Sequence, residues 1–422
     1  MASSAREVIK QTSEDTLAVR YARVRARSHE LIAPLSAEDA CVQAMPDTSP
    51  AKWHLAHVTW FFETFVLEPR EPRFKPFHPA FRELFNSYYN AVGKQFPRAE
   101  RGLLTRPSLH EVLAYRAAVD ARMKTLLVTV DEQLSAIIEL GLHHEQQHQE
   151  LLLMDIKYLL SLNPLAPVYR EDATPANLVA SEMRWRVTPQ GLVEIGHHGA
   201  GFHFDNETPR HAALLAPHAL ASRLVSNGEY LAFMRDGGYQ RAALWLADAW
   251  STRQREAWRA PQYWREVDGA WFEFTLSGLR PLDLAAPVCH VSHYEADAYA
   301  QWAEARLPTE FEWEAAAAHS AVTAAADEIE HLHPRATVGC ADFDDLFGAV
   351  WQWTRSAYLP YPGFKAPLGA VGEYNGKFMS NQMVLKGSCC ATPPGHARAS
   401  YRNFFYAQQR WAFAGIRLAR DL

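Results

Sequence analysis

The chain has 422 residues and a net charge of −6, with 48% hydrophobic and 21% charged residues. This length favours two domains, and the composition is that of a globular protein. The negative charge gives no reason to expect nucleic acid or an anionic membrane as a partner. No segment offers the roughly 18 apolar residues of a membrane span, and the first residues have no signal-peptide pattern. The five scattered cysteines form no disulfide framework and no C-x-x-C motif, so we expect a cytoplasmic protein.

The first 165 residues have the patterns of a helical bundle. Ser49 followed by Pro50 predicts a helix start, with serine as the N-cap. Ser108 and Glu111 form a capping-box pattern before a second long helix. Apolar residues at helical spacing predict helices over 14–32, 37–44, 51–67, 112–127 and 131–162. Several long helices with apolar faces indicate a bundle.

The second half of the chain has a different pattern. Several prolines among polar residues predict a linker over 166–190. From residue 191 the segments are short and rich in Gly, Pro and Trp, with helical patterns only over 226–234, 294–303 and 309–318. The sequence therefore predicts an α+β two-domain chain, with a helical bundle at 1–165 and a loop-rich domain at 191–422.

The stretch HEQQH, His144 to His148, permits two interpretations. It fits the H-E-x-x-H pattern of zinc peptidases, with Glu145 as the base. It also fits H-x-x-x-H-x-E, ending at Glu150, in which two histidines bind a metal and the third ligand lies elsewhere. Histidines four residues apart lie on the same side of a helix, one turn from each other. The flanking leucines predict that this side is buried, and buried imidazoles need partners.

The peptidase interpretation lacks a third ligand. Leu151 occupies the position at which the longer zinc-peptidase motif has glycine. The nearest downstream glutamates, Glu171 and Glu182, fall in the proline-rich linker.

A better third ligand lies upstream, in the stretch WHLAH. His57 shares a helix face with Trp53 and Trp60 and is expected to face the bundle interior, while His54 is the competitor. Facing helices of a bundle often build metal sites from such side chains. Three histidines without a carboxylate leave about half of the coordination sphere open, which suits Fe(II) that must hold both a substrate and O2.

The chain resembles a known family over nearly its whole length. The segments SPAKWHLAHVTWFFETF, LFNSYYNAVG, RGLLTRPS and LHHEQQHQELLL resemble a DinB-like four-helix bundle. The segments VSNGEYLAFM, RLPTEFEWE, FGAVWQWT, KGSCCATP and FAGIRLARDL resemble the formylglycine-generating-enzyme (sulfatase-modifying) domain, which has a C-type-lectin-like fold. Together they resemble the ergothioneine-biosynthesis sulfoxide synthases (EgtB), particularly the shorter, cysteine-using branch.

This resemblance implies the ligand set. The family motif maps onto His144, His148 and Glu150, and its upstream ligand maps onto His57. The implied cofactor is Fe(II). Glu145 would then be an ordinary helix residue, while Glu150 could accept the second N–H of a metal-bound imidazole.

The resemblance also implies an oxidoreductase reaction. A thiol and hercynine, the betaine of histidine, would react with O2, and the sulfur would become bonded to imidazole C2 as a sulfoxide. Tyr88 and Tyr89 match the branch whose active-site tyrosine comes from the N-terminal domain. We expect one to be a core aromatic residue and the other to reach the iron, without deciding between them.

Candidate substrate residues come from both domains. Asn403, Phe404 and Phe405 match the family's substrate loop, where aromatic faces would attract the quaternary ammonium group of hercynine. Gln147 matches a glutamine that orients the substrate imidazole. We therefore expect the two domains to share the substrate site.

A carboxylate on the donor would call for arginines. Arg98 and Arg101 fit best, with Arg106 as the alternative. A small donor is expected, free cysteine or a selenosugar, rather than γ-glutamylcysteine.

Other functions remain open on the sequence. Selenoneine synthases (SenA) resemble the same branch and use a selenosugar. A zinc metallopeptidase and a non-catalytic DinB-type binding protein are less favoured. Formylglycine generation is disfavoured, because Cys389 and Cys390 are adjacent and no second spaced cysteine follows.

Overall fold

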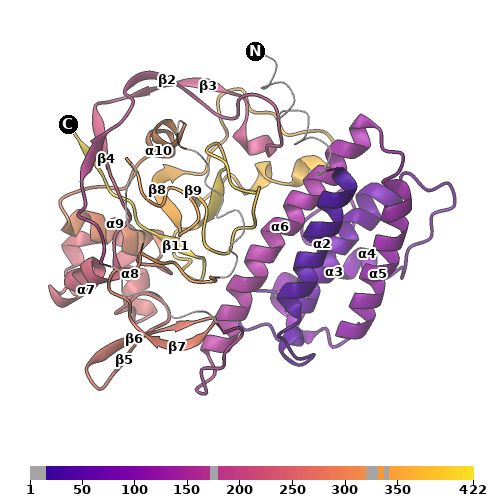
Figure 1. Ribbon diagram of the computed structural model, residues 1–422, viewed down its shortest axis with the longest axis horizontal. Helices are drawn as coiled ribbons and strands as arrows, with labels where there is room; N and C mark the ends of the chain where they lie inside the picture. Colours follow the sequence, from indigo (N-terminus) through magenta and orange to yellow (C-terminus); the bar gives the residue numbers. More distant parts are fainter. Residues whose placement is uncertain (1–15, 172–178, 319, 321–330, 337–341) are drawn as a thin grey trace, which may run out of the picture. The chain divides into compact units, whose positions relative to one another are not determined.

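The computed structural model describes residues 16–171, 179–318, 320, 331–336 and 342–422 (Figure 1). Two compact units divide the chain: Met1–Leu159 with Gly369–Val371, and Leu160–Leu368 with Gly372–Leu422. The linker expected at 166–190 contains residues 172–178, which lie outside the described part.

The first unit is a helical bundle, as the sequence predicts. Figure 1 shows its long helices running alongside one another. The stretch 37–44, expected to be helical, forms only a three-residue 3₁₀ turn at Asp39–Cys41. The α-helices are α2 (Leu17–Ile32), α3 (Ala51–Phe62), α4 (Phe81–Leu84), α5 (Leu109–Leu126) and α6 (Glu132–Ser161).

Helices begin at both predicted starts, but only one of the two predicted serine caps is confirmed. Ser108 and Glu111 form the expected capping box at the start of α5. The prediction for Ser49 is wrong, because Pro50 is the N-cap of α3 and no side chain caps this end. The Ser49 hydroxyl instead accepts a hydrogen bond from Arg101 at 2.9 Å.

Helix α3 is the core of the bundle. All 12 of its residues are buried, whereas the sequence pattern predicted a single buried face. It continues into a π-helical segment, Glu63–Leu67. A close approach to α6 occurs at Gly141, where a Cβ atom would lie 2.7 Å from the Phe62 ring and 2.9 Å from the Phe61 ring. A larger residue at this position would therefore force the two phenylalanine rings to shift.

The described residues of the second unit form four small sheets. The central one has the order β10-β9-β8-β11, and β11 pairs parallel to β8 while the other pairs are antiparallel. Its strands are β8 (Trp351–Ala357), β9 (Gln382–Gly387), β10 (Asn403–Tyr406) and β11 (Ala414–Gly415). A second sheet joins β1 (Trp185–Val187), β4 (His218–Ala221) and β12 (Ala419–Asp421). The others are β2 (Gly191–Ile195) with β3 (His211–Leu215), and β5 (Trp264–Val267), β6 (Ala270–Thr275) with β7 (Gly278–Pro281).

Helices pack against two of these sheets. The three predicted helices are confirmed, and each begins with a capping box. They are α7 (Asn227–Arg235), α9 (His293–Trp302) and α10 (Glu310–Ala317), and α8 (Ala247–Arg255) was not predicted. Trp313, Trp351 and Trp353 are fully buried, which accounts for part of the high tryptophan content. This unit is therefore the mixed helix-and-strand domain that the sequence predicts.

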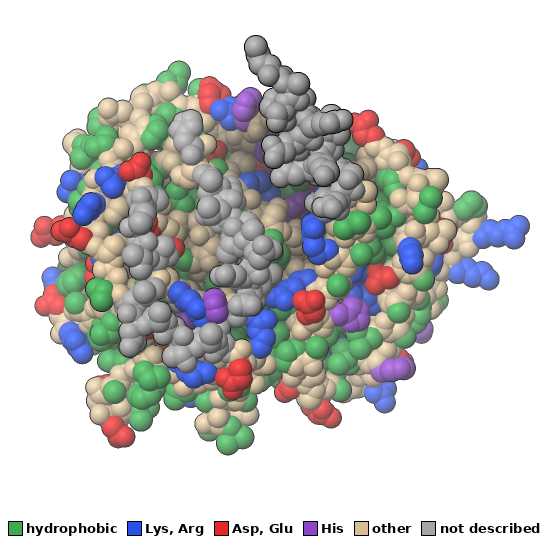
Figure 2. Space-filling view, in the orientation of Figure 1, with side chains coloured by type: hydrophobic (Ala, Val, Ile, Leu, Met, Phe, Trp, Pro, Cys, Tyr) green, Lys and Arg blue, Asp and Glu red, His purple; other side chains and the backbone are tan. Residues whose placement is uncertain are grey.

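The surface agrees with the modest net charge. On the face of the helical unit drawn in Figure 2, acidic, basic and apolar side chains are intermixed. Among the described helices, none is both long enough and apolar enough to cross a membrane.

Candidate metal centre

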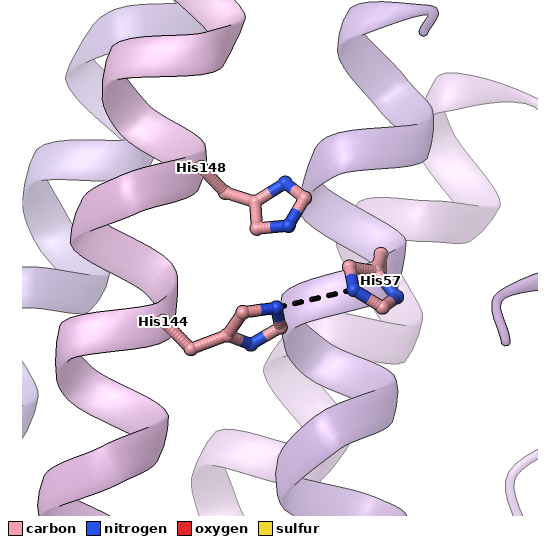
Figure 3. A group of neighbouring side chains, drawn as sticks. All are labelled: His57, His144 and His148. Carbon is pink, nitrogen blue, oxygen red and sulfur yellow. Dashed lines mark hydrogen bonds between the residues drawn. The ribbon is translucent and has the colours of Figure 1, made fainter. Parts of the chain in front are cut away.

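Three histidines converge inside the helical unit. His57 comes from α3, while His144 and His148 come from successive turns of α6 (Figure 3). Nε2 of His57 lies 3.1 Å from Nε2 of His144. One ring nitrogen from each of the three lies within 4.8 Å of the others, so the group could hold a metal ion. Within the part of the chain that the structure describes, no other group of His, Cys, Asp or Glu has this geometry, and this one excludes His54.

Burial keeps these imidazoles in the form that binds metals. His57 and His144 are almost completely buried, and His148 is partly exposed. Burial lowers the pKa of His57 and His148 well below the usual value, and the neighbouring His144 lowers both further. Burial also lowers the pKa of His144 to about 3. All three rings are therefore neutral near pH 7, and each has a lone pair available to a metal.

The second ring nitrogens of two of these histidines have defined partners. Nδ1 of His57 donates to the backbone oxygen of Phe85 at 2.6 Å, which leaves Nε2 for the cluster. Nδ1 of His148 lies 2.8 Å from Nδ1 of His54. Glu150, expected to accept such an N–H, is therefore not the partner of His57 or His148. Hydrogen bonds of this kind fix the tautomer and orientation of metal-bound imidazoles.

Aromatic rings hold His57 from both sides. Trp53 stacks on His57 with the ring centroids 4.7 Å apart, and Trp60 stacks on the other side at 5.6 Å. The Arg101 guanidinium lies 3.4 Å from the centre of the Trp53 ring. The layered stack of Arg101, Trp53, His57 and Trp60 restricts rotation of the imidazole and places a cation two layers away from it.

The environment of Glu145 differs from the one expected. It was expected to be an ordinary helix residue, yet it is fully buried. Its Oε2 accepts from Arg25 at 2.8 Å, and its Oε1 accepts from Ser28 at 2.6 Å and from Arg116. Both oxygens are therefore bound, and Glu145 is outside the histidine group. It joins α2, α5 and α6 and cannot act as the base of a peptidase.

The two candidate tyrosines occupy different environments. Tyr89 is fully buried, and its ring packs on Trp60 and Phe65 at 5.6 and 5.1 Å. Tyr88 is partly exposed and stacks on Tyr89 at 4.6 Å, with 3.5 Å between the two hydroxyl oxygens. One is thus a core aromatic residue, as expected, and that one is Tyr89. That the other tyrosine, Tyr88, reaches the iron stays a prediction.

The two candidate arginines also differ. Arg98 is exposed and donates to the backbone oxygen of Asp47. Arg101 is buried. Burial is the main cause of its lowered pKa, and repulsion from Arg98 lowers this pKa further. Among the described residues, no carboxylate forms an ion pair with Arg101, and its Nε has no hydrogen-bond partner. A buried cation without an ion-pair partner is suited to an anionic ligand.

The candidate residues of the second unit lie on β10, which pairs with β9. The Phe404 ring stacks on Tyr358 at 4.1 Å, and Phe405 packs edge-on against Trp411. Adjacent residues of a strand point to opposite faces, so Phe404 and Phe405 cannot serve the same face. Asn403 shares its face with Phe405.

Two residues around the cluster were missed or misjudged from the sequence. His54 was considered only as a rival ligand, and Asp155 was assigned no role in the site. The structure shows Asp155 Oδ2 3.0 Å from Nε2 of His54, whose Nδ1 contacts His148. The available signal was the spacing of seven residues between His148 and Asp155, which places both on one side of α6. Gln147, also on α6, is partly exposed.

Comparisons with known proteins agree with the domain types predicted for both halves of the chain. Residues 20–152 match the DinB superfamily, and residues 173–422 match the sulfatase-modifying factor enzyme 1-like domain. A hercynine oxygenase of Mycobacterium tuberculosis is 31% identical over 97% of this chain and 100% of its own length. A hercynine oxygenase of Mycolicibacterium smegmatis is 29% identical with the same coverage of both chains. A formylglycine-generating enzyme of Streptomyces coelicolor is 35% identical over 28% of this chain and 41% of its own.

The family expected from the motifs is confirmed by these matches. Both domain types occur in the expected order, and similarity at about 30% identity extends along nearly the whole of this chain and the whole of the mycobacterial relatives. The chain belongs to the EgtB hercynine oxygenase family.

Proposed function

We propose that this chain is a non-haem Fe(II) oxygenase that uses O2 to join a chalcogen donor to imidazole C2 of hercynine. Membership of the hercynine oxygenase family supports hercynine as the substrate. The observation that carries the proposal is the cluster of three buried, neutral imidazoles without a carboxylate. Three protein ligands leave about half of an octahedral sphere open, and Fe(II), when bound, would supply positions there for a thiolate, an imidazole and O2.

The two rival functions fit the site less well. A zinc peptidase would need Glu145 as a base, and both of its oxygens are bound by Arg25, Ser28 and Arg116. A non-catalytic binding protein has no need of three desolvated imidazoles, whose burial costs free energy unless they bind something.

A product analysis tests the function. The stoichiometry is hercynine plus thiol plus O2 giving the sulfoxide-linked product plus water, so one oxygen atom enters each product. With full-length protein, Fe(II), hercynine, cysteine and ¹⁸O2, mass spectrometry should find one ¹⁸O in the adduct. O2 uptake that does not need hercynine, or hydrolysis of peptides, would contradict the proposal.

Cysteine is the proposed donor, and Arg101 is the proposed contact for its carboxylate. The Trp53 stack and the hydrogen bond to Ser49 fix the Arg101 guanidinium, whereas Arg98 is exposed. We expect Arg101→Ala to raise KM for cysteine by roughly tenfold or more, because charge-assisted bonds are worth about 1.5–3 kcal/mol. Arg98→Ala should have a smaller effect, and steady-state kinetics with each variant measures both.

Steady-state kinetics of these variants also distinguish cysteine from the other possible donors. Arg101→Lys keeps the charge and controls for the loss of a buried cation. Unchanged turnover in both alanine variants, together with a preference of the wild type for a selenosugar, would favour the selenoneine synthase alternative. Faster turnover of γ-glutamylcysteine than of either small donor would contradict a small-donor site.

Tyr88 is the proposed proton donor, because it is partly exposed while Tyr89 is fully buried among aromatic rings. Proton transfer by a positioned side chain contributes about 10²–10⁴-fold to a rate. Tyr88→Phe should therefore lower kcat by about 100-fold or more, while Tyr89→Phe should change kcat much less. Single-turnover rates of the two matched variants decide the assignment, and a larger loss in Tyr89→Phe would reverse it.

Hercynine recognition is proposed for Asn403 and Phe405, with Gln147 orienting the imidazole. Phe405 is chosen over Phe404 because the Phe404 ring already stacks on Tyr358. A cation–π contact is worth about 0.5–2 kcal/mol, so Phe405→Leu should raise KM for hercynine by roughly 2- to 30-fold. Gln147→Ala should also raise it. An effect of Phe404→Leu on this KM equal to that of Phe405→Leu would contradict the choice of strand face.

A further inference from the structure

Asp155, His54 and His148 form a chain of polar contacts that ends at the proposed metal site. Oδ2 of Asp155 lies 3.0 Å from Nε2 of His54, and Nδ1 of His54 lies 2.8 Å from Nδ1 of His148. His54 and Asp155 are 3% and 8% exposed, so water does not replace these contacts. These contacts connect Asp155 on α6 to His54 on α3, and His54 to His148 on α6.

Hydrogen-bond chemistry assigns the protons along this chain. An ionised carboxylate only accepts hydrogen bonds, so Nε2 of His54 carries the proton in its contact with Asp155. The backbone N–H of Ser49 also donates to this oxygen, at 2.8 Å. With His54 in its neutral form, which has a single N–H, Nδ1 of His54 is the acceptor and Nδ1 of His148 is the donor.

These contacts determine the tautomer of His148. With its proton on Nδ1, His148 keeps the lone pair on Nε2. Figure 3 shows one nitrogen of His148 facing His57 and His144, and the other pointing away from them. The opposite tautomer would place a proton on Nε2 and block metal binding at that atom.

We propose that Asp155 and His54 are positioning residues that hold His148 in the tautomer and orientation needed to bind the metal. The inference rests on the proposed metal site and extends it to two residues that do not touch the metal. His57 is oriented by a backbone oxygen, that of Phe85. The second ring nitrogen of His148 instead contacts a side chain, that of His54, so substitution can test its role.

Binding of Co(II) to the full-length protein, without substrate, provides the test. Partners that orient metal-bound histidines typically contribute 10–100-fold to metal affinity. Asp155→Ala and His54→Ala should weaken Co(II) binding by this factor. Asp155→Asn should stay within about threefold of the wild type, because the Ser49 N–H keeps the amide oxygen at the position of Oδ2. This rescue by the conservative variant would not follow from a merely structural role.

Asp120→Ala is the matched control. Asp120 also accepts two hydrogen bonds inside the bundle, from Tyr21 at 2.6 Å and from Arg25 at 2.7 Å. The Asp120→Ala variant should have a lower thermal stability than the wild type and the same Co(II) affinity. A second readout is ¹⁵N NMR of histidine-labelled, metal-free protein, in which His148 should be protonated at Nδ1 in the wild type and should lose this preference in Asp155→Ala.

Two outcomes would overturn the inference in different ways. If Asp155→Ala and His54→Ala bind Co(II) as tightly as the wild type and Asp120→Ala, the two residues do not position His148. If the wild type binds no Co(II), or His57→Ala binds it equally well, the metal site itself is wrong, and the proposed function fails with it.

Discussion

His57→Ala should remove metal binding and hercynine-dependent turnover together. His57 is the only ligand that α3 supplies to the group of three, and the two histidines of α6 cannot form a three-ligand site alone. The loss should exceed the 10–100-fold that partners of metal ligands contribute. Equilibrium dialysis with Fe(II) under anaerobic conditions, followed by an activity assay, measures both.

His54→Ala is the matched comparison for that variant. It removes a buried histidine from the same helix, three residues away, and it should weaken metal binding without abolishing it. Excess Fe(II) should therefore restore turnover in His54→Ala and fail to do so in His57→Ala. Retention of iron by His57→Ala and its complete loss in His54→Ala would contradict the ligand assignment.

Glu145→Ala should cause the largest loss of stability among the predicted variants. It would leave Arg25 and Arg116 buried without the carboxylate that both contact. Breaking a buried ion pair by removing one partner costs about 3–5 kcal/mol. Denaturant unfolding followed by circular dichroism measures this cost. The folded protein should keep its metal, because Glu145 is outside the histidine group.

The pH dependence of stability provides a second readout of the same network. Burial alone would raise the pKa of Glu145, but Arg116 and Arg25 outweigh it and lower this pKa to about 2. A carboxyl group with a lowered pKa in the folded state stabilises the fold above its unfolded value, near 4.5. This stabilisation is lost as the pH falls from about 4.5 towards 2. In Glu145→Gln this part of the pH dependence should be absent, and an unchanged profile would show that the pair adds little stability.

The three candidate ligands could be predicted because local spacing determines much of their geometry. The interval between His144 and His148 places both on one side of a helix, and His57 shares one side of its helix with Trp53 and Trp60. The families of both domains could also be recognised from short motifs. These features need no knowledge of how distant segments pack.

The features that escaped prediction depend on tertiary packing. Glu145 binds Arg25 and Arg116, which lie 120 and 29 residues away in the sequence. The contact between His54 and His148 spans 94 residues and depends on how α3 packs on α6. The different burial of Tyr88 and Tyr89 depends on the position of Trp60 and has no signal in the pair itself. In the second unit, short strands among loops gave no periodicity from which α8 or the strand bounds could be predicted.

The metal dependence of the reaction tests the central claim most directly. Full-length protein should be purified without oxygen, stripped of metal, and reloaded with Fe(II) or with Zn(II) in parallel. The account predicts one Fe(II) per chain, O2 consumption that requires both hercynine and a chalcogen donor, and no turnover with Zn(II). Equal activity of the zinc-loaded protein, or O2 consumption by the iron-loaded protein that does not depend on hercynine, would contradict it.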